Sequence, residues 1–136
     1  MIMHDVMTDE IRNFFESVPI IAFSMTDNNG NPNVVAIASK RIVDSDTIWV
    51  IDTFFGKTKE NLLQNERVAI AVWVKGKGYQ IKGTARYHSD GKIFDEGKKW
   101  ILESRPNKIV KGVAEIKVSE IFSITPTYEE AGKKIA

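Results

Sequence analysis

Short runs of β-branched and aromatic residues, bounded by turn-forming residues, constrain the fold of this chain more than any other feature. Runs of this kind cover residues 20–26, 33–43, 47–53, 67–74, 79–88 and 113–124, the last with a bend at Ser119. Each run is long enough for one strand. The dense turn sequence at residues 27–32 joins the first two runs as a hairpin, and tight connections favour antiparallel pairing. The pattern predicts about six strands.

Residues 9–18, 56–65 and 91–103 carry apolar side chains at helical spacing, so two or three helices flank the strands. No helix separates the first three strands, which argues against a doubly wound parallel sheet. The chain has 136 residues, the size of one domain, and closing a small antiparallel sheet into a barrel removes its exposed edges. We therefore expect one domain over residues 1–136, built around a closed β-barrel.

Two of the expected strands are apolar on both faces. Residues 34–38 read Val-Val-Ala-Ile-Ala, and residues 68–74 read Val-Ala-Ile-Ala-Val-Trp-Val. A strand of this kind must be covered on the outside of the barrel as well as on the inside. A helix, a ligand or a second subunit can supply that cover.

Composition excludes several classes of function. The chain has 19 Lys and Arg against 18 Asp and Glu, so no overall charge attracts nucleic acid or an anionic membrane. It has no cysteine and two histidines, which excludes thiolate sites and makes a histidine-built metal site unexpected. No apolar run approaches the roughly 20 residues of a membrane-spanning helix, and the N-terminus carries acids where a secretory signal is basic. We expect a cytoplasmic protein without nucleic-acid or membrane partners.

The segment at residues 52–62 carries the strongest chemical signal, because it runs from a strand end through a turn into a helix. Backbone N–H groups at a helix N-terminus favour anions, and Lys57 and Thr58 add a charge and a hydroxyl there. A nucleotide-binding P-loop does not fit, since Ile51 occupies the position of its leading glycine. One interpretation is a phosphate site. The other is that Thr58 caps the helix while Lys57 and Lys59 face solvent.

Two aromatic residues, Phe54 and Phe55, stand just before this helix. Next to a phosphate site they can stack on a ring system, and otherwise they serve as core or dimer contacts. The sequence leaves both interpretations open.

The order and spacing of these segments resemble the small FMN-binding split-barrel proteins related to pyridoxamine 5'-phosphate oxidase. The resemblance extends over essentially the whole chain and rests on residues 27–38, 48–53, 56–62, 65–70 and 79–85. It implies a mainly β fold, a six-stranded antiparallel split β-barrel of the Greek-key type with two or three flanking helices. It also implies that residues 1–136 form a single FMN-binding domain.

The same resemblance implies that FMN lies outside one barrel, at a homodimer interface. Main-chain contacts to the flavin would come from Val35, Ala36, Ile37, Ala38 and Ser39, with Asp52 and Thr53 flanking it. The phosphate would be held by Lys57 and Thr58 with support from Asn61, and Gln80 is a further candidate contact. Because the flavin carries the redox chemistry, no catalytic side chain and no metal are expected.

The function expected from this resemblance is that of an FMN flavoprotein, an oxidoreductase or electron carrier between a small-molecule donor and acceptor. The C-terminal Arg-x-His substrate motif of the pyridoxamine phosphate oxidases is absent after Val118, so that activity is not expected. A deazaflavin-dependent reductase, a non-catalytic flavin-storage module and a barrel without a cofactor remain as alternatives.

Overall fold

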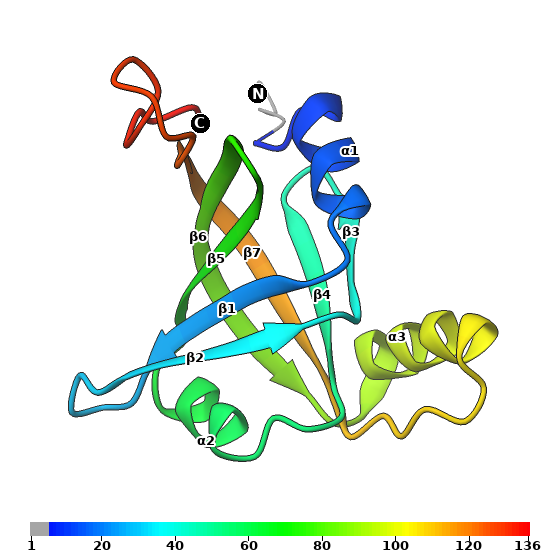
Figure 1. The fold of residues 1–136 in the computed structure, drawn as a ribbon. Helices are drawn as coiled ribbons and strands as arrows, with labels where there is room; N and C mark the ends of the chain where they lie inside the picture. The colour runs from blue at the N-terminus through cyan, green and yellow to red at the C-terminus, as the bar shows by residue number, and fades with distance from the viewer. Residues whose placement is uncertain (1–5) are drawn as a thin grey trace, which may run out of the picture.

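The computed structural model describes residues 6–136; residues 1–5, which begin the acidic N-terminus, lie outside the described residues. Figure 1 shows a strongly curled sheet with helices at its margins. The elements in chain order are α1 (Asp9–Ser17), β1 (Ile21–Thr26), β2 (Pro32–Ile37), β3 (Lys40–Asp44), β4 (Thr47–Asp52), α2 (Lys57–Gln64), β5 (Arg67–Val74), β6 (Lys77–His88), α3 (Gly91–Ser104) and β7 (Gly112–Ser123).

The seven strands form one sheet in the order β2-β1-β5-β6-β7-β4-β3. Every neighbouring pair is antiparallel. The edge strands β2 and β3 are consecutive in the chain, and only Ala38 and Ser39 separate them. Three Cα steps span at most about 11 Å, so the sheet must curl until its two edges meet. The result is a split barrel, open where β2 and β3 part, which confirms the predicted fold class.

The predicted strand over residues 33–43 is wrong as a single element, and this accounts for seven strands rather than six. Ile37 pairs with Ile21 at one edge of the sheet, whereas Lys40 pairs with Val50 at the other. The backbone of Ser39 already belongs to the second edge, since its carbonyl accepts a hydrogen bond from Ile51 N at 3.0 Å. The chain changes partners here because the barrel closes, not because a turn-forming residue breaks the strand.

The bend expected at Ser119 is a β-bulge. Lys82 lies opposite Glu120 and Gly83 opposite Val118, which leaves Ser119 as the extra residue. A glycine is needed at position 83, because a Cβ atom there would lie 2.1 Å from the carbonyl oxygen of Lys117. The bulge bends β6 and β7, the long strands that carry the curl of the sheet.

Two apolar clusters hold the fold. The larger cluster fills the barrel with side chains that are almost wholly buried, among them Phe23, Ile48, Ile81 and Ile121. The smaller cluster packs α3 onto the outside of β4 and β7 through Trp49, Ile51, Ile101 and Val113. Among residues 6–136, no helix is both long and apolar enough to cross a membrane.

Candidate functional site

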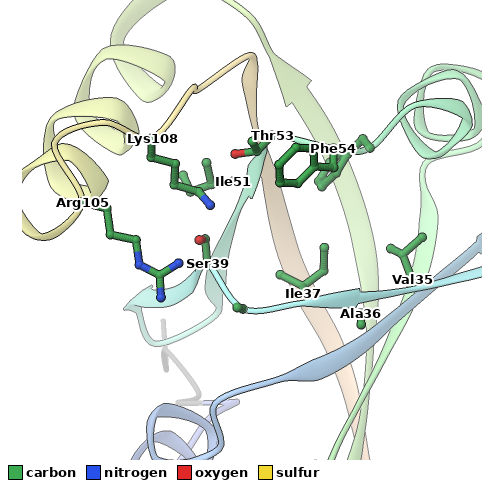
Figure 2. Close-up of a pocket in the computed structure, with 11 residues that line it drawn as sticks. Val35, Ala36, Ile37, Ser39, Ile51, Thr53, Phe54, Arg105 and Lys108 are labelled. Atoms are coloured by element: carbon green, nitrogen blue, oxygen red, sulfur yellow. The ribbon is translucent and has the colours of Figure 1, made fainter.

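An open pocket of about 310 Å³ lies between β2, the turn after β4 and the segment that follows α3 (Figure 2). This volume is at the lower end of the roughly 300–1,000 Å³ typical of small-molecule sites. Its lining is mainly apolar, with a few polar groups on one side. The lining residues are Val35, Ala36, Ile37, Ala38, Ser39, Ile51, Thr53, Phe54, Phe55, Arg105 and Lys108.

The pocket brings together six of the eleven residues expected to contact the flavin, and Phe54 and Phe55 as well. Residues 35–39 form one wall, and Thr53 stands on the opposite wall at the end of β4. Val35 and Ile37 point into the barrel, whereas Ala36 and Ala38 are exposed. The alternation of β2 therefore leaves Ala36 on the outer surface together with the larger Val34.

Asp52 does not line the pocket but positions its wall. Its buried carboxylate accepts a hydrogen bond from Tyr87 Oη at 2.5 Å and another from Phe55 N at 3.0 Å. Burial, then the hydrogen bond to Asp52 and its negative charge, raise the pKa of Tyr87 well above its ordinary value. The phenol therefore stays protonated and continues to hold the turn.

Thr53 ties the same turn to the segment after α3. Its Oγ1 donates to the carbonyl of Ile109 at 2.7 Å, and Lys111 N donates to the carbonyl of Asp52 at 2.9 Å. These bonds hold the turn after β4 and the segment after α3, which form two walls of the pocket, in a fixed position relative to one another.

The two aromatic residues after β4 have different roles. Phe54 is 91% exposed and lines the pocket, so it is free to cover a ligand. The side chain of Phe55 is buried, with ring centroids 6.3 Å from Phe23 and 6.4 Å from Tyr87. The core interpretation is correct for Phe55, and Phe54 remains available for stacking.

The start of α2 differs from the capping interpretation in its cap, whereas Lys57 and Lys59 are exposed as that interpretation expects. The N-cap of α2 is Gly56, at a positive φ of 52°, so Thr58 is not the cap. Thr58 is fully buried, and its hydroxyl accepts a hydrogen bond from Asn33 Nδ2 at 3.0 Å. The amides of Thr58 and Lys59 donate to the carbonyls of Phe55 and Gly56. Of the expected phosphate ligands, only the Lys57 side chain is exposed on this turn, and within residues 6–136 it forms no ion pair.

Asn61 and Gln80 lie outside the pocket. Asn61 is half-buried on α2, one turn after Lys57. Gln80 is on the outer face of the sheet, between Ala71 of β5 and Phe122 of β7.

Three polar groups on one side of the pocket were not predicted as a set. Ser39 is buried, and its Oγ has no hydrogen-bond partner within the described part of the chain. Arg105 and Lys108 extend toward it from the segment after α3 (Figure 2). Burial, and then the positive charge of Arg105, hold the pKa of Lys108 below its ordinary value. The helical pattern indicates only that α3 ends near Arg105, and no local signal places these cations beside Ser39.

The outer face of β1, β2 and β5 stays uncovered in one chain. Ala36 lies opposite Ala22, and Ala22 lies opposite Ala71, so a row of small residues crosses three strands. Val34 and Trp73, 64% and 52% exposed, line a shallow apolar groove on the same face. The sequence predicts that this outer face is covered. Within residues 6–136, neither a helix nor a loop covers it.

Comparison with known proteins identifies the family. A sequence model described as pyridoxamine 5'-phosphate oxidase matches residues 7–125. The chain belongs to this family. A relative of this chain is an uncharacterized protein of Methanocaldococcus jannaschii, 30% identical over 133 residues, which cover 96% of this chain and 88% of that protein.

Solved structures agree with the family assignment. HupZ of Group A Streptococcus superposes with a TM-score of 0.83 at 25% identity, covering 96% of this chain and 99% of that one. An FMN-binding protein from Syntrophomonas wolfei superposes with a TM-score of 0.73 at 19% identity, covering 85% of this chain and 84% of that one. The second likeness shows that the two proteins share the split-barrel fold of the pyridoxamine 5'-phosphate oxidase family.

Proposed function

We propose that this protein binds FMN in the pocket beside β2 and acts as a flavin-dependent oxidoreductase or electron carrier. The observation that carries the proposal is the pocket itself. A mainly apolar wall from residues 35–39 and an exposed aromatic side chain match a flat ring system, and the exposed Lys57, three residues after Phe54, matches its anionic tail. Membership of the family and the FMN-binding protein of the same fold support this choice of ligand.

The residues of the pocket and of the first turn of α2 are assigned to the parts of FMN. Residues 35–39 border the ring with main chain and small side chains, and Phe54 covers it from the turn after β4. Lys57 holds the phosphate from the first turn of α2, where the helix dipole adds positive potential. Thr58 does not reach the ligand but stabilises the start of α2 by accepting a hydrogen bond from Asn33. Asn61 lies one helical turn after Lys57.

When bound, FMN supplies the redox chemistry of the site. The protein binds and orients the flavin, and the Asp52 carboxylate keeps the turn of Phe54 and Phe55 in place through its bond to Phe55 N. No side chain of the pocket is assigned as an acid, base or nucleophile.

We further propose that two copies associate through the apolar face of β1, β2 and β5. Val34 and Trp73 are large apolar side chains exposed together beside the alanine row, which is the kind of patch that marks an interface. Residues 35 and 36 line both this groove and the flavin pocket, so the partner chain would border the flavin. Gln80 would meet the flavin only across such an interface.

Equilibrium titration of the flavin-free protein with FMN and with riboflavin tests the proposal. FMN is expected to bind more tightly than riboflavin, because only FMN carries the phosphate. Mass spectrometry of any cofactor that copurifies identifies it directly. Release of a deazaflavin, or absence of binding to either flavin, would contradict the assignment. Steady turnover with a reduced nicotinamide and an electron acceptor would exclude a storage role.

A further inference from the structure

A second open pocket, of about 390 Å³, lies between the outer face of β3 and β4 and the first two turns of α3. The volume is within the roughly 300–1,000 Å³ typical of small-molecule sites. Val43, Trp49 and Ile93 supply its apolar surface, and charged side chains supply the rest. The pocket shares no lining residue with the one beside β2, which is reached from the opposite end of α3.

A β-bulge brings two charged residues of β3 to this pocket. The register of β3 against β4 shifts between Ile42 and Asp44, which leaves Val43 as the extra residue. In a regular strand, Arg41 and Asp44 would point to opposite faces of the sheet, because they are three residues apart. With the extra residue, both of them line the pocket. Bulges are over-represented beside functional sites, where they redirect a side chain.

The charges of Arg41 and Asp44 are not paired within the chain. Over residues 6–136, no carboxylate oxygen lies within 4.0 Å of the Arg41 guanidinium, and no cationic nitrogen lies within 4.0 Å of the Asp44 carboxylate. The nearby Lys117 donates instead to Thr47 Oγ1 at 2.7 Å and lies 3.8 Å from Asp46.

The other charged side chains of the lining have partners. Lys92 Nζ lies 3.9 Å from Glu96, one turn further along α3. Glu115 lies 3.1 Å from Nε2 of His88. The pocket therefore offers a ligand one unpaired cation and one unpaired carboxylate.

Trp49 gives an independent indication of a ligand. The residue is only 7% exposed, it lines the same pocket, and its indole N–H has no hydrogen-bond partner in the part of the chain that the structure describes. Buried polar groups nearly always form a hydrogen bond, and an indole nitrogen can only donate. The missing partner is therefore an acceptor. Since this nitrogen is covered, side chains of the lining have to move for a ligand to reach it, and Arg41 and Lys92 are exposed enough to do so.

Structural roles explain these residues only in part. Arg41 lies over the ring of Trp100, with its guanidinium carbon 5.5 Å from the ring centroid. Asp44 Oδ1 accepts a hydrogen bond from Asp46 N at 3.1 Å in the turn between β3 and β4. Neither contact supplies an opposite charge. Packing of Trp49 against α3 leaves its N–H unused.

We infer that Arg41, Asp44 and Trp49 form a second binding site, which takes a free amino acid. Arg41 and the Trp49 N–H donate hydrogen bonds to its carboxylate, and Asp44 accepts hydrogen bonds from its ammonium group. The side chain of the ligand lies against Val43 and Ile93. A ligand with only one of the two charges leaves either Arg41 or Asp44 without a partner. The inference does not depend on the proposed function.

Thermal denaturation of the full chain tests whether the site binds such a ligand. Each proteinogenic amino acid is added in turn at low millimolar concentration, and one that binds the folded protein raises the melting temperature. Calorimetry then compares the best ligand with its N-acetyl derivative, which lacks the ammonium group, and with its amide, which lacks the carboxylate. We expect each derivative to bind at least tenfold more weakly. Stabilisation by none of the amino acids, or equal affinity for a derivative, would overturn the inference.

Two variants with matched controls locate the site. Arg41→Gln and Asp44→Asn each remove one charge, and the asparagine keeps an oxygen that can accept from the amide of Asp46. The controls are Arg67→Gln and Asp95→Asn, because both residues are exposed and lie outside the pocket. We expect each site variant to weaken binding of the best amino acid by about 10- to 100-fold and each control to leave it unchanged. Equal affinities in all four variants would place the ligand elsewhere and overturn the inference.

Trp49→Phe separates binding from packing. The variant keeps an aromatic ring but has no N–H to donate to the carboxylate. We expect it to weaken binding of the amino acid more than binding of the amide, so the affinity ratio of the two ligands falls. A tryptophan that serves packing alone would give a lower melting temperature and an unchanged affinity ratio, which would overturn its place in the site.

Discussion

Tyr87 donates a hydrogen bond from Oη to Oδ2 of Asp52 at 2.5 Å, and this bond joins β6 to the end of β4. The other carboxylate oxygen, Oδ1, accepts the amide of Phe55 at 3.0 Å. One buried carboxylate thus connects the barrel wall to the turn that borders the candidate pocket. The stability of the fold and the shape of the pocket depend on the same side chain.

Replacing Tyr87 with phenylalanine is expected to destabilise the protein. The variant leaves Asp52 buried with one hydrogen bond fewer, which costs about 1–3 kcal/mol in the free energy of unfolding. Urea denaturation measures this, with Tyr128→Phe as the matched control, because Tyr128 is fully exposed. Equal unfolding free energies for Tyr87→Phe and the wild type would show that the bond contributes nothing.

The same tyrosine predicts a pH dependence of stability. The pKa of Tyr87 in the folded protein is raised above its ordinary value of 10.0, chiefly by burial and then by Asp52. The folded state therefore keeps the proton at a pH where the unfolded chain has lost it. The contribution of Tyr87 is complete below about pH 10 and decreases as the pH rises further.

Denaturation measured between about pH 9 and pH 11 checks this dependence. The wild type should lose more stability over this range than Tyr87→Phe, in which the titrating group is absent. Parallel curves for the two proteins would contradict the assignment.

Much of the fold follows from local sequence patterns. The helix predicted over residues 9–18 is present as α1, where the hydroxyl of Thr8 accepts a hydrogen bond from Ile11 N at 3.3 Å, and the bend at Ser119 is present as a bulge. The break between β2 and β3 could not be predicted in this way. Residues 33–43 contain no glycine or proline, and the change of partner at Ala38 and Ser39 is imposed by closure of the barrel.

Only some residues of the candidate site can be predicted from the sequence. Residues 35–39 and Thr53 were assigned through their place in a familiar order of motifs, and the structure brings them into one pocket. Arg105 and Lys108 are far from them in the chain. Their approach depends on how α3 packs, with Gly97 against Val113, where a Cβ atom would lie 2.7 Å from Val113 Cγ2. No periodicity within one segment encodes such a contact.

Lys57→Gln is expected to weaken FMN binding by about 10- to 100-fold, because it removes the charge assigned to the phosphate. Riboflavin binding should stay unchanged, since riboflavin has no phosphate. Fluorescence titration measures both affinities, and Lys75→Gln, in the turn between β5 and β6, serves as the control. Equal losses for FMN and riboflavin would mean that Lys57 acts on the fold instead of the phosphate.

Val34→Glu is expected to weaken self-association at least tenfold, because the variant would bury a charge at an apolar interface. A tenfold change in the dissociation constant corresponds to roughly 1.4 kcal/mol. Sedimentation equilibrium measures the dimer dissociation constant. Leu63→Glu is the matched control, because Leu63 is 65% exposed, close to the 64% of Val34, and lies on α2 outside the groove. If both variants associate like the wild type, the face of β1, β2 and β5 is not the interface.

The visible absorption spectrum of the full chain, incubated with FMN and then desalted, measures FMN binding directly. The protein is expected to retain equimolar FMN with a shifted flavin band, and denaturation is expected to release the flavin unchanged. A colourless protein after desalting, with all of the FMN in the small-molecule fraction, would contradict the proposed binding of FMN.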